Sequence, residues 1–241
     1  MALPVQNTPV YTLEIPSTKE KFKFRPFLVK EEKALLIAQQ SEDVTVMSDT
    51  LKGIIESCAK NKIDVESLAT FDIEYIFCQI RAKSVGETVD LMFYCDTCEN
   101  DPKAAVKLNI DITKIDVEFD PDHSKKIPLF DDVGIIMKYP GINMLSKLAA
   151  LSDSNDGDVN SVIEVMAQSI DMIYSGDEIH HGKDTKLEEM VEFVNNLTSE
   201  QFTKMKDFFE SMPKYQHRVE YKCPVCSLDH KKILSGISNF F

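Results

Sequence analysis

Four of the six cysteines stand in two Cys-x-x-Cys pairs, Cys95 with Cys98 and Cys223 with Cys226. In such a turn the backbone amides face the two sulfurs, so each pair offers two thiolates to one metal ion. Two pairs together supply the four soft ligands of a tetrahedral zinc site, each sulfur about 2.3 Å from the metal. Because four thiolates fill the coordination shell, the sequence predicts one structural Zn²⁺ with no open catalytic position.

The two pairs are separated by far more residues than in a compact zinc ribbon, so a shared metal would join the first half of the chain to the second. Two alternatives remain, redox thiols and unliganded thiols. A redox pair needs a helix N-terminus to lower the pKa of its attacking thiol, and turn and strand patterns follow both pairs instead. His230 can replace one sulfur, although an exposed strand residue is the favoured interpretation.

Two other groups of polar residues have a simpler interpretation than a functional site. The segment 153–158, DSNDGD, resembles a calcium loop, but its glycine stands at position five where an EF-hand needs it at six. A solvated acidic loop before the next helix is favoured. His180 and His181 precede Gly182 and are interpreted as part of an exposed turn. The chain contains no glycine-rich phosphate loop, nucleophile elbow or HExxH motif, so we do not expect an enzyme.

The hydrophobic pattern predicts an α+β fold with helical bundles and short antiparallel β-ribbons. A hairpin is expected over 11–27, helices over 29–58 and 65–84, and a strand on each side of both cysteine pairs. In the second half we expect a strand at 133–139, helices at 142–152 and 158–174, and capping boxes at Thr185 and Thr198. The shared order of elements suggests two duplicated halves, 1–115 and 133–241, joined by an acidic linker at 116–132 and by the zinc-ribbon-like site.

Composition excludes several classes of protein. The chain has 241 residues and a formal net charge of −13, which disfavours binding to nucleic acid. No apolar run approaches the ~20 residues of a membrane span. Residues 1–10 lack the basic and apolar regions of a secretion leader, so we expect the protein in the cytosol. Cytosolic reductants oppose a disulfide scaffold, which leaves metal binding as the best use of the paired cysteines.

Several of these features together resemble a known family. The segment 21–38, KFKFRPFLVKEEKALLIA, the two cysteine pairs and the ending 237–241, ISNFF, are similar to the baseplate hub subunit and hub assembly family of T4-type tailed phages. The resemblance implies a non-enzymatic protein that binds other hub proteins during tail assembly in the host cytoplasm. Such a protein either leaves after assembly or remains in the tail baseplate of the virion. The resemblance brings no catalytic residue and no small-molecule substrate.

Two segments are candidates for binding a partner protein. The first is the pair Phe240 and Phe241, because two aromatics at a free end can insert into a pocket of a partner or fold back into the core. The second is the basic and aromatic part of the hairpin, comprising Lys21, Phe22, Phe24 and Arg25. A different function also fits the residues: a zinc-ribbon protein that binds and regulates a host protein machine.

Overall fold

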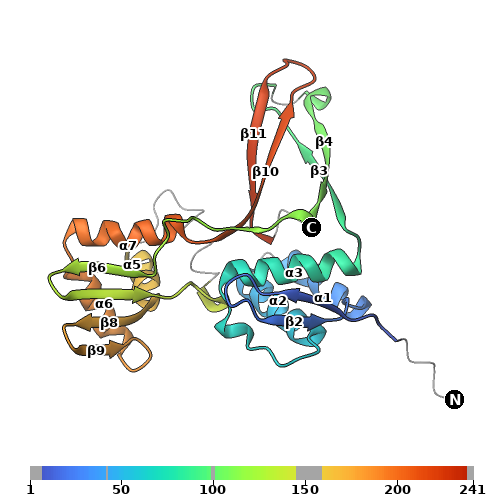
Figure 1. Ribbon diagram of the computed structural model, residues 1–241. Coiled ribbons are helices and arrows are strands. Elements are labelled where there is room, and N and C mark those ends of the chain that lie inside the picture. The colour runs from blue at the N-terminus through green and yellow to red at the C-terminus, as the bar shows by residue number, and fades with distance from the viewer. Residues whose placement is uncertain (1–6, 42, 99–100, 145–158, 238–241) are drawn as a thin grey trace.

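The computed structural model describes residues 7–41, 43–98, 101–144 and 159–237, and its fold is α+β, as predicted (Figure 1). The described helices are α1 (Val29–Ser41), α2 (Val44–Cys58), α3 (Thr70–Ser84), α5 (Val159–Gln168), α6 (Leu187–Asn195) and α7 (Ser199–Ser211). Four short 3-10 helices accompany them: η1 (Val65–Ser67), η2 (Pro102–Ala104), η3 (Ile112–Lys114) and η4 (Ile142–Met144).

Every strand pair in the described chain is antiparallel. The strands are β1 (Tyr11–Glu14), β2 (Lys21–Phe24), β3 (Thr88–Phe93), β4 (Val106–Asp111), β5 (Val117–Glu118), β6 (Lys126–Phe130), β7 (Val133–Met137), β8 (Ile170–Ser175), β9 (Glu178–His181), β10 (Lys214–Lys222) and β11 (Asp229–Ser235). They form the sheets β1-β2, β3-β4, β11-β10-β5 and β6-β7-β8-β9. The described strands therefore form several small, separate sheets and not one continuous sheet.

The first hydrophobic core is built around α3. This helix is apolar on most of its circumference, and Phe71, Ile76 and Ile80 are all buried. The sequence pattern predicts such a central helix, and the structure confirms it. Asp72, on the same helix, accepts hydrogen bonds from the backbone N–H of Ser17 (2.9 Å) and from its hydroxyl (2.5 Å). These bonds attach the turn between β1 and β2 to the first turn of α3.

The strand β2 is part of this core, which corrects the interpretation of its aromatic residues as an exposed docking site. Phe22 and Phe24 are 0% and 2% exposed, and Arg25 is 8% exposed. Lysine and phenylalanine alternate along β2, so the two phenylalanines point into the core while Lys21 is exposed. Of this candidate set, only Lys21 is accessible to a partner protein.

The buried Arg25 is paired through both of its terminal guanidinium nitrogens. Its guanidinium donates to the Glu31 carboxylate at 2.8 Å, and the Ser57 hydroxyl donates to the same oxygen at 2.7 Å. The other carboxylate oxygen accepts from the N–H of Leu28 at 2.8 Å. Burial alone would raise the pKa of Glu31, but the hydrogen bonds from Arg25, Ser57 and Leu28 outweigh it and lower that pKa to about 2.

Acid is therefore expected to weaken the fold through Glu31. Because the folded-state pKa is depressed, the carboxylate stabilises the protein above its ordinary pKa, and this contribution disappears as the pH falls from about 4.5 towards 2. The shift corresponds to about 3 kcal/mol. Glu31→Gln should therefore lower stability at pH 7 and flatten the acid dependence, measured by urea unfolding at pH 7 and pH 3. The exposed neighbour variant Glu32→Gln is the control, and equal pH dependence in the two variants would contradict this role of Glu31.

The second core lies between the sheet β6-β7-β8-β9 and the helices α5, α6 and α7. Ile135, Met205 and Phe208 are among its most buried side chains. The capping box predicted at Thr198 is present, because its hydroxyl accepts from the Gln201 N–H while the Gln201 side chain accepts from the Thr198 N–H. The box predicted at Thr185 is absent: the Thr185 hydroxyl donates to the His181 carbonyl, and α6 starts at Leu187.

Three features of the chain after residue 115 differ from the expected elements. The helix expected over 158–174 ends at Gln168, and the chain continues as β8, which pairs with β7 and β9. The acidic segment 116–132, expected to be a linker, contains the whole of β5 and β6. Strands β6 to β9 also form a four-stranded sheet, whereas β1-β2 and β3-β4 are two-stranded, so the sheets in the two parts of the chain differ.

The hairpins β3-β4 and β10-β11 form a feature that we call the arm, comprising these four strands and the turns that connect them. Both hairpins rise from the region of α3 and approach each other at their tips (Figure 1). Their apolar faces belong to the first core, and the rings of Phe93 and Tyr221 lie 5.2 Å apart. Although β10 and β11 come late in the chain, they pack with the first core rather than the second.

Candidate metal centre

The four paired cysteines converge at the tip of the arm. One sulfur from each of Cys95, Cys98, Cys223 and Cys226 lies within 4.8 Å of the other three, and the sulfurs of Cys95 and Cys226 are 3.6 Å apart. A tetrahedral zinc–thiolate site places its sulfurs about 3.8 Å apart, given metal–sulfur distances of about 2.3 Å. The donor set and its spacing therefore fit one tetrahedral ion.

The strands position the cysteines through their register. Lys222 pairs with Asp229 as the last pair of β10 and β11, so the second cysteine pair occupies the turn beyond them. Within that turn the Cys223 N–H donates to the Leu228 carbonyl at 2.9 Å, and the Ser227 N–H donates to the Cys223 carbonyl at 3.0 Å. Ser227 adopts a left-handed backbone with φ of 60°, which closes the turn.

The backbone of the first pair stabilises a thiolate. Burial opposes ionisation of Cys95, but the amides of Cys98 and Thr97 donate to its sulfur and lower its pKa to about 6. The hydrogen bond with Cys226 contributes most to raising the pKa of Cys98 to about 12. Four neighbouring sulfurs cannot all carry a negative charge unless a cation offsets their repulsion, and a bound divalent metal supplies that charge.

The remaining two cysteines do not take part in this cluster. Cys58 and Cys78 are both fully buried in the first core, as their positions on apolar helix faces predicted. Burial raises the pKa of Cys58 to about 11 and that of Cys78 to about 12. Both thiols are thus held in the neutral form at physiological pH.

Side chains of β10 and β11 complete the surroundings of the cluster, and the sequence did not single out most of them. The Tyr221 hydroxyl donates to the Tyr94 carbonyl at 3.0 Å, and His230 Nε2 lies 3.2 Å from the Cys95 sulfur. The Lys232 ammonium pairs with Asp96 at 3.3 Å. His230 is partly buried, not the exposed strand residue that was favoured from the sequence.

The other candidate residues lie elsewhere or outside the described chain. His180 and His181 are exposed, as expected, but they belong to the edge strand β9 instead of a turn. The acidic segment 153–158 lies outside the described residues, and so do Phe240 and Phe241.

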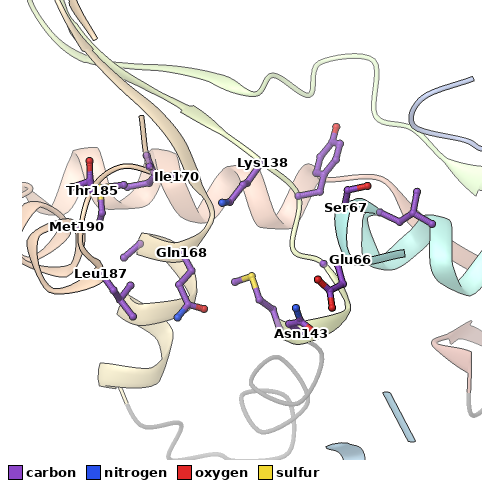
Figure 2. Close-up of a pocket in the computed structure, with 15 residues that line it drawn as sticks. Glu66, Ser67, Lys138, Asn143, Gln168, Ile170, Thr185, Leu187 and Met190 are labelled. Atoms are coloured by element: carbon purple, nitrogen blue, oxygen red, sulfur yellow. The ribbon is translucent and has the colours of Figure 1, made fainter. Parts of the chain in front are cut away.

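A cavity of about 600 Å³ lies between the two cores (Figure 2). Glu66 and Ser67 border it from the first core, and Lys138, Gln168 and Thr185 border it from the second. Glu66 is already ion-paired with Lys52. The described lining contains no cysteine or histidine, and the group of side chains in the described residues that could hold a metal ion is the one at the arm tip.

Comparison with known proteins places nearly the whole chain in one family. No helix in the described residues has the length and apolar character needed to cross a membrane. No curated protein and no solved structure matches the sequence significantly. The model of one protein family, described as T4 bacteriophage base plate protein, matches residues 8–241. Since this match covers nearly the entire sequence, the chain belongs to the T4 bacteriophage base plate protein family.

Proposed function

We propose that this chain is a non-enzymatic baseplate hub subunit or hub assembly factor, and that one structural Zn²⁺ holds its arm together. The observation that carries the proposal is the family match over residues 8–241, which makes the chain a phage baseplate protein. Membership of that family implies contacts with other structural proteins of the phage. The hub role and the direct binding of other hub proteins are the further steps proposed here.

The chemistry of the arm tip supports zinc as the metal. Four thiolates in tetrahedral spacing suit Zn²⁺, whereas Mg²⁺ and Ca²⁺ prefer oxygen ligands. Such a site stabilises a fold because the ion binds only the folded arrangement of its ligands. Here the ligands come from two hairpins that are distant in the sequence, so the metal would fix the tips of β3-β4 and β10-β11 to each other.

The absence of catalysis is also proposed on chemical grounds. Zn²⁺ bound by four thiolates keeps no position for water or substrate, and its role is structural. The regulator of a host protein machine, which the cysteine pairs alone also allowed, is not favoured by the family match. Assembly in the host cytoplasm, with or without retention in the virion, belongs to the same proposal.

Partner binding is proposed to involve Lys21 and the pair Phe240 and Phe241. Lys21 remains accessible on β2, and Phe240 and Phe241 stay candidates for insertion into a partner. Lys21 is expected to contribute mainly to the rate of association, because an exposed charge steers encounter more than it adds affinity.

Co-expression tests the hub role. The tagged chain is produced together with each other baseplate protein of the same phage, one at a time, and purified by affinity and size exclusion. We expect one or more hub proteins to co-elute in a fixed ratio, and an unrelated acidic protein with the same tag, as control, to retain none. If no hub protein is retained, the proposed function is wrong.

A further inference from the structure

Hairpin β10-β11 contacts three consecutive residues of the first cysteine turn. Tyr221, His230 and Lys232 all lie on the face of the hairpin that is turned towards β3-β4, and they reach Tyr94, Cys95 and Asp96 respectively. The contact of His230 differs from the other two because its partner is a sulfur of the candidate metal centre.

The geometry of His230 orients one ring nitrogen towards that sulfur. The imidazole stacks on the Tyr221 ring, with centroids 5.0 Å apart and planes inclined by 15°. Tyr221 is itself held by its hydrogen bond to the Tyr94 carbonyl. With the ring plane fixed in this way, Nε2 lies 3.2 Å from the Cys95 sulfur.

The chemistry of a metal-bound thiolate decides which atom carries the proton. A thiolate has no hydrogen and only accepts, so an imidazole nitrogen at this distance must be protonated to form a hydrogen bond. His230 is not one of the four residues whose ligand atoms lie within 4.8 Å of one another. In this arrangement it lies beside Cys95, one of the residues that would hold the ion.

We propose that His230 is a positioning residue of the metal centre, whose Nε2–H donates a hydrogen bond to the Cys95 thiolate and slows the release of the metal. The inference rests on the proposed structural zinc. Four thiolates around a dication carry an excess of negative charge, and hydrogen bonds from neighbouring donors offset it. Cys95 already accepts from the amides of Thr97 and Cys98, and His230 adds a donor from the opposite hairpin.

Two substitutions separate hydrogen bonding from ring stacking. His230→Phe keeps an aromatic ring against Tyr221 but removes the N–H, whereas His230→Gln removes the ring and keeps an amide donor. His217→Phe is the matched control, because His217 lies on the same face of β10, four residues before Tyr221. Circular dichroism of each zinc-loaded variant establishes that the fold is retained.

The measurement is the rate at which zinc passes from the full-length protein to an excess of a chromogenic chelator. Loss of an outer hydrogen-bond partner of a metal site costs 10- to 100-fold in affinity. We expect His230→Phe to release zinc at least about 10-fold faster than the wild type, with His230→Gln much closer to the wild type and His217→Phe unchanged. In the Co²⁺-substituted protein, the thiolate-to-cobalt charge-transfer band should move to longer wavelength in His230→Phe alone.

The results distinguish this inference from the proposed function. If the wild type binds zinc and His230→Phe releases it at the wild-type rate, or if His230→Gln is the faster variant, His230 acts by stacking and the inference is wrong. If the wild-type protein holds no zinc, the proposed metal centre fails and the inference fails with it.

Discussion

Cys223→Ser is expected to deprive the protein of its metal. The substitution removes one of four thiolates and leaves an open, weaker site, so freshly purified protein should contain well under one zinc per chain, against one in the wild type. Structural zinc contributes on the order of 10 kcal/mol to small zinc domains, and the loss of one ligand should lower the free energy of unfolding by roughly 3 kcal/mol. Elemental analysis and urea unfolding measure the two effects.

A buried cysteine outside the cluster provides the matched control for this experiment. Cys78→Ala should keep a full complement of zinc, because Cys78 lies in the first core on α3. The substitution should leave a small cavity that lowers the free energy of unfolding by about 1 kcal/mol. Stoichiometric zinc in Cys223→Ser, or loss of zinc in Cys78→Ala, would contradict the assignment of the ligands.

The second large effect is expected at Phe22. This side chain is fully buried and stacks on Phe24 at 5.9 Å, so Phe22→Ala should cost about 3–5 kcal/mol of folding free energy. Lys21→Ala, on the adjacent exposed position of β2, should change stability by less than about 0.5 kcal/mol. Thermal or urea unfolding of the two variants checks this directly. A Phe22→Ala protein as stable as the wild type, but impaired in partner binding, would restore the docking interpretation.

Sequence patterns were most informative where the chemistry is local. Two cysteines three residues apart in a strand–turn–strand pattern form a recognisable unit, and a buried helix such as α3 is visible from its apolar faces. The capping box at Thr198 was found for the same reason, because all of its partners lie within one helical turn. These elements need no information from distant parts of the chain.

The segment 170–174 was expected to be helical, but it forms part of β8. Apolar residues at Val159, Met166 and Ile173 fit a helix, and the helix was therefore expected to continue through 174. Residues 170–174, IDMIY, are also rich in the β-branched and aromatic side chains that favour a strand, and pairing with β7 and β9 selects the strand. Ser169 marks the change, since its N–H still bonds to helical carbonyls while the next residue begins β8. Only the pairing with neighbouring strands distinguishes a strand from a helix at this point.

Residues whose surroundings come from distant segments could not be interpreted from the sequence. The alternation of β2 does not reveal which of its faces joins the first core, so Phe22 and Phe24 were taken as accessible. Likewise, His230 and Cys95 are 135 positions apart in the sequence, and their contact depends on how the two hairpins pack against each other. The acidic composition and prolines of 116–132 indicated a linker. In the structure two strands of this segment find distant partners, because β5 pairs with β10 and β6 pairs with β7.

The most direct test of a role in building the baseplate is the structure of tails produced without this protein. Cells infected with a phage from which its gene has been deleted can be lysed and their tail structures examined by negative-stain electron microscopy, with the wild-type gene supplied in trans as the control. We predict that complete baseplates are missing without the gene and restored by it. Complete baseplates in normal numbers in the absence of this protein would contradict the account.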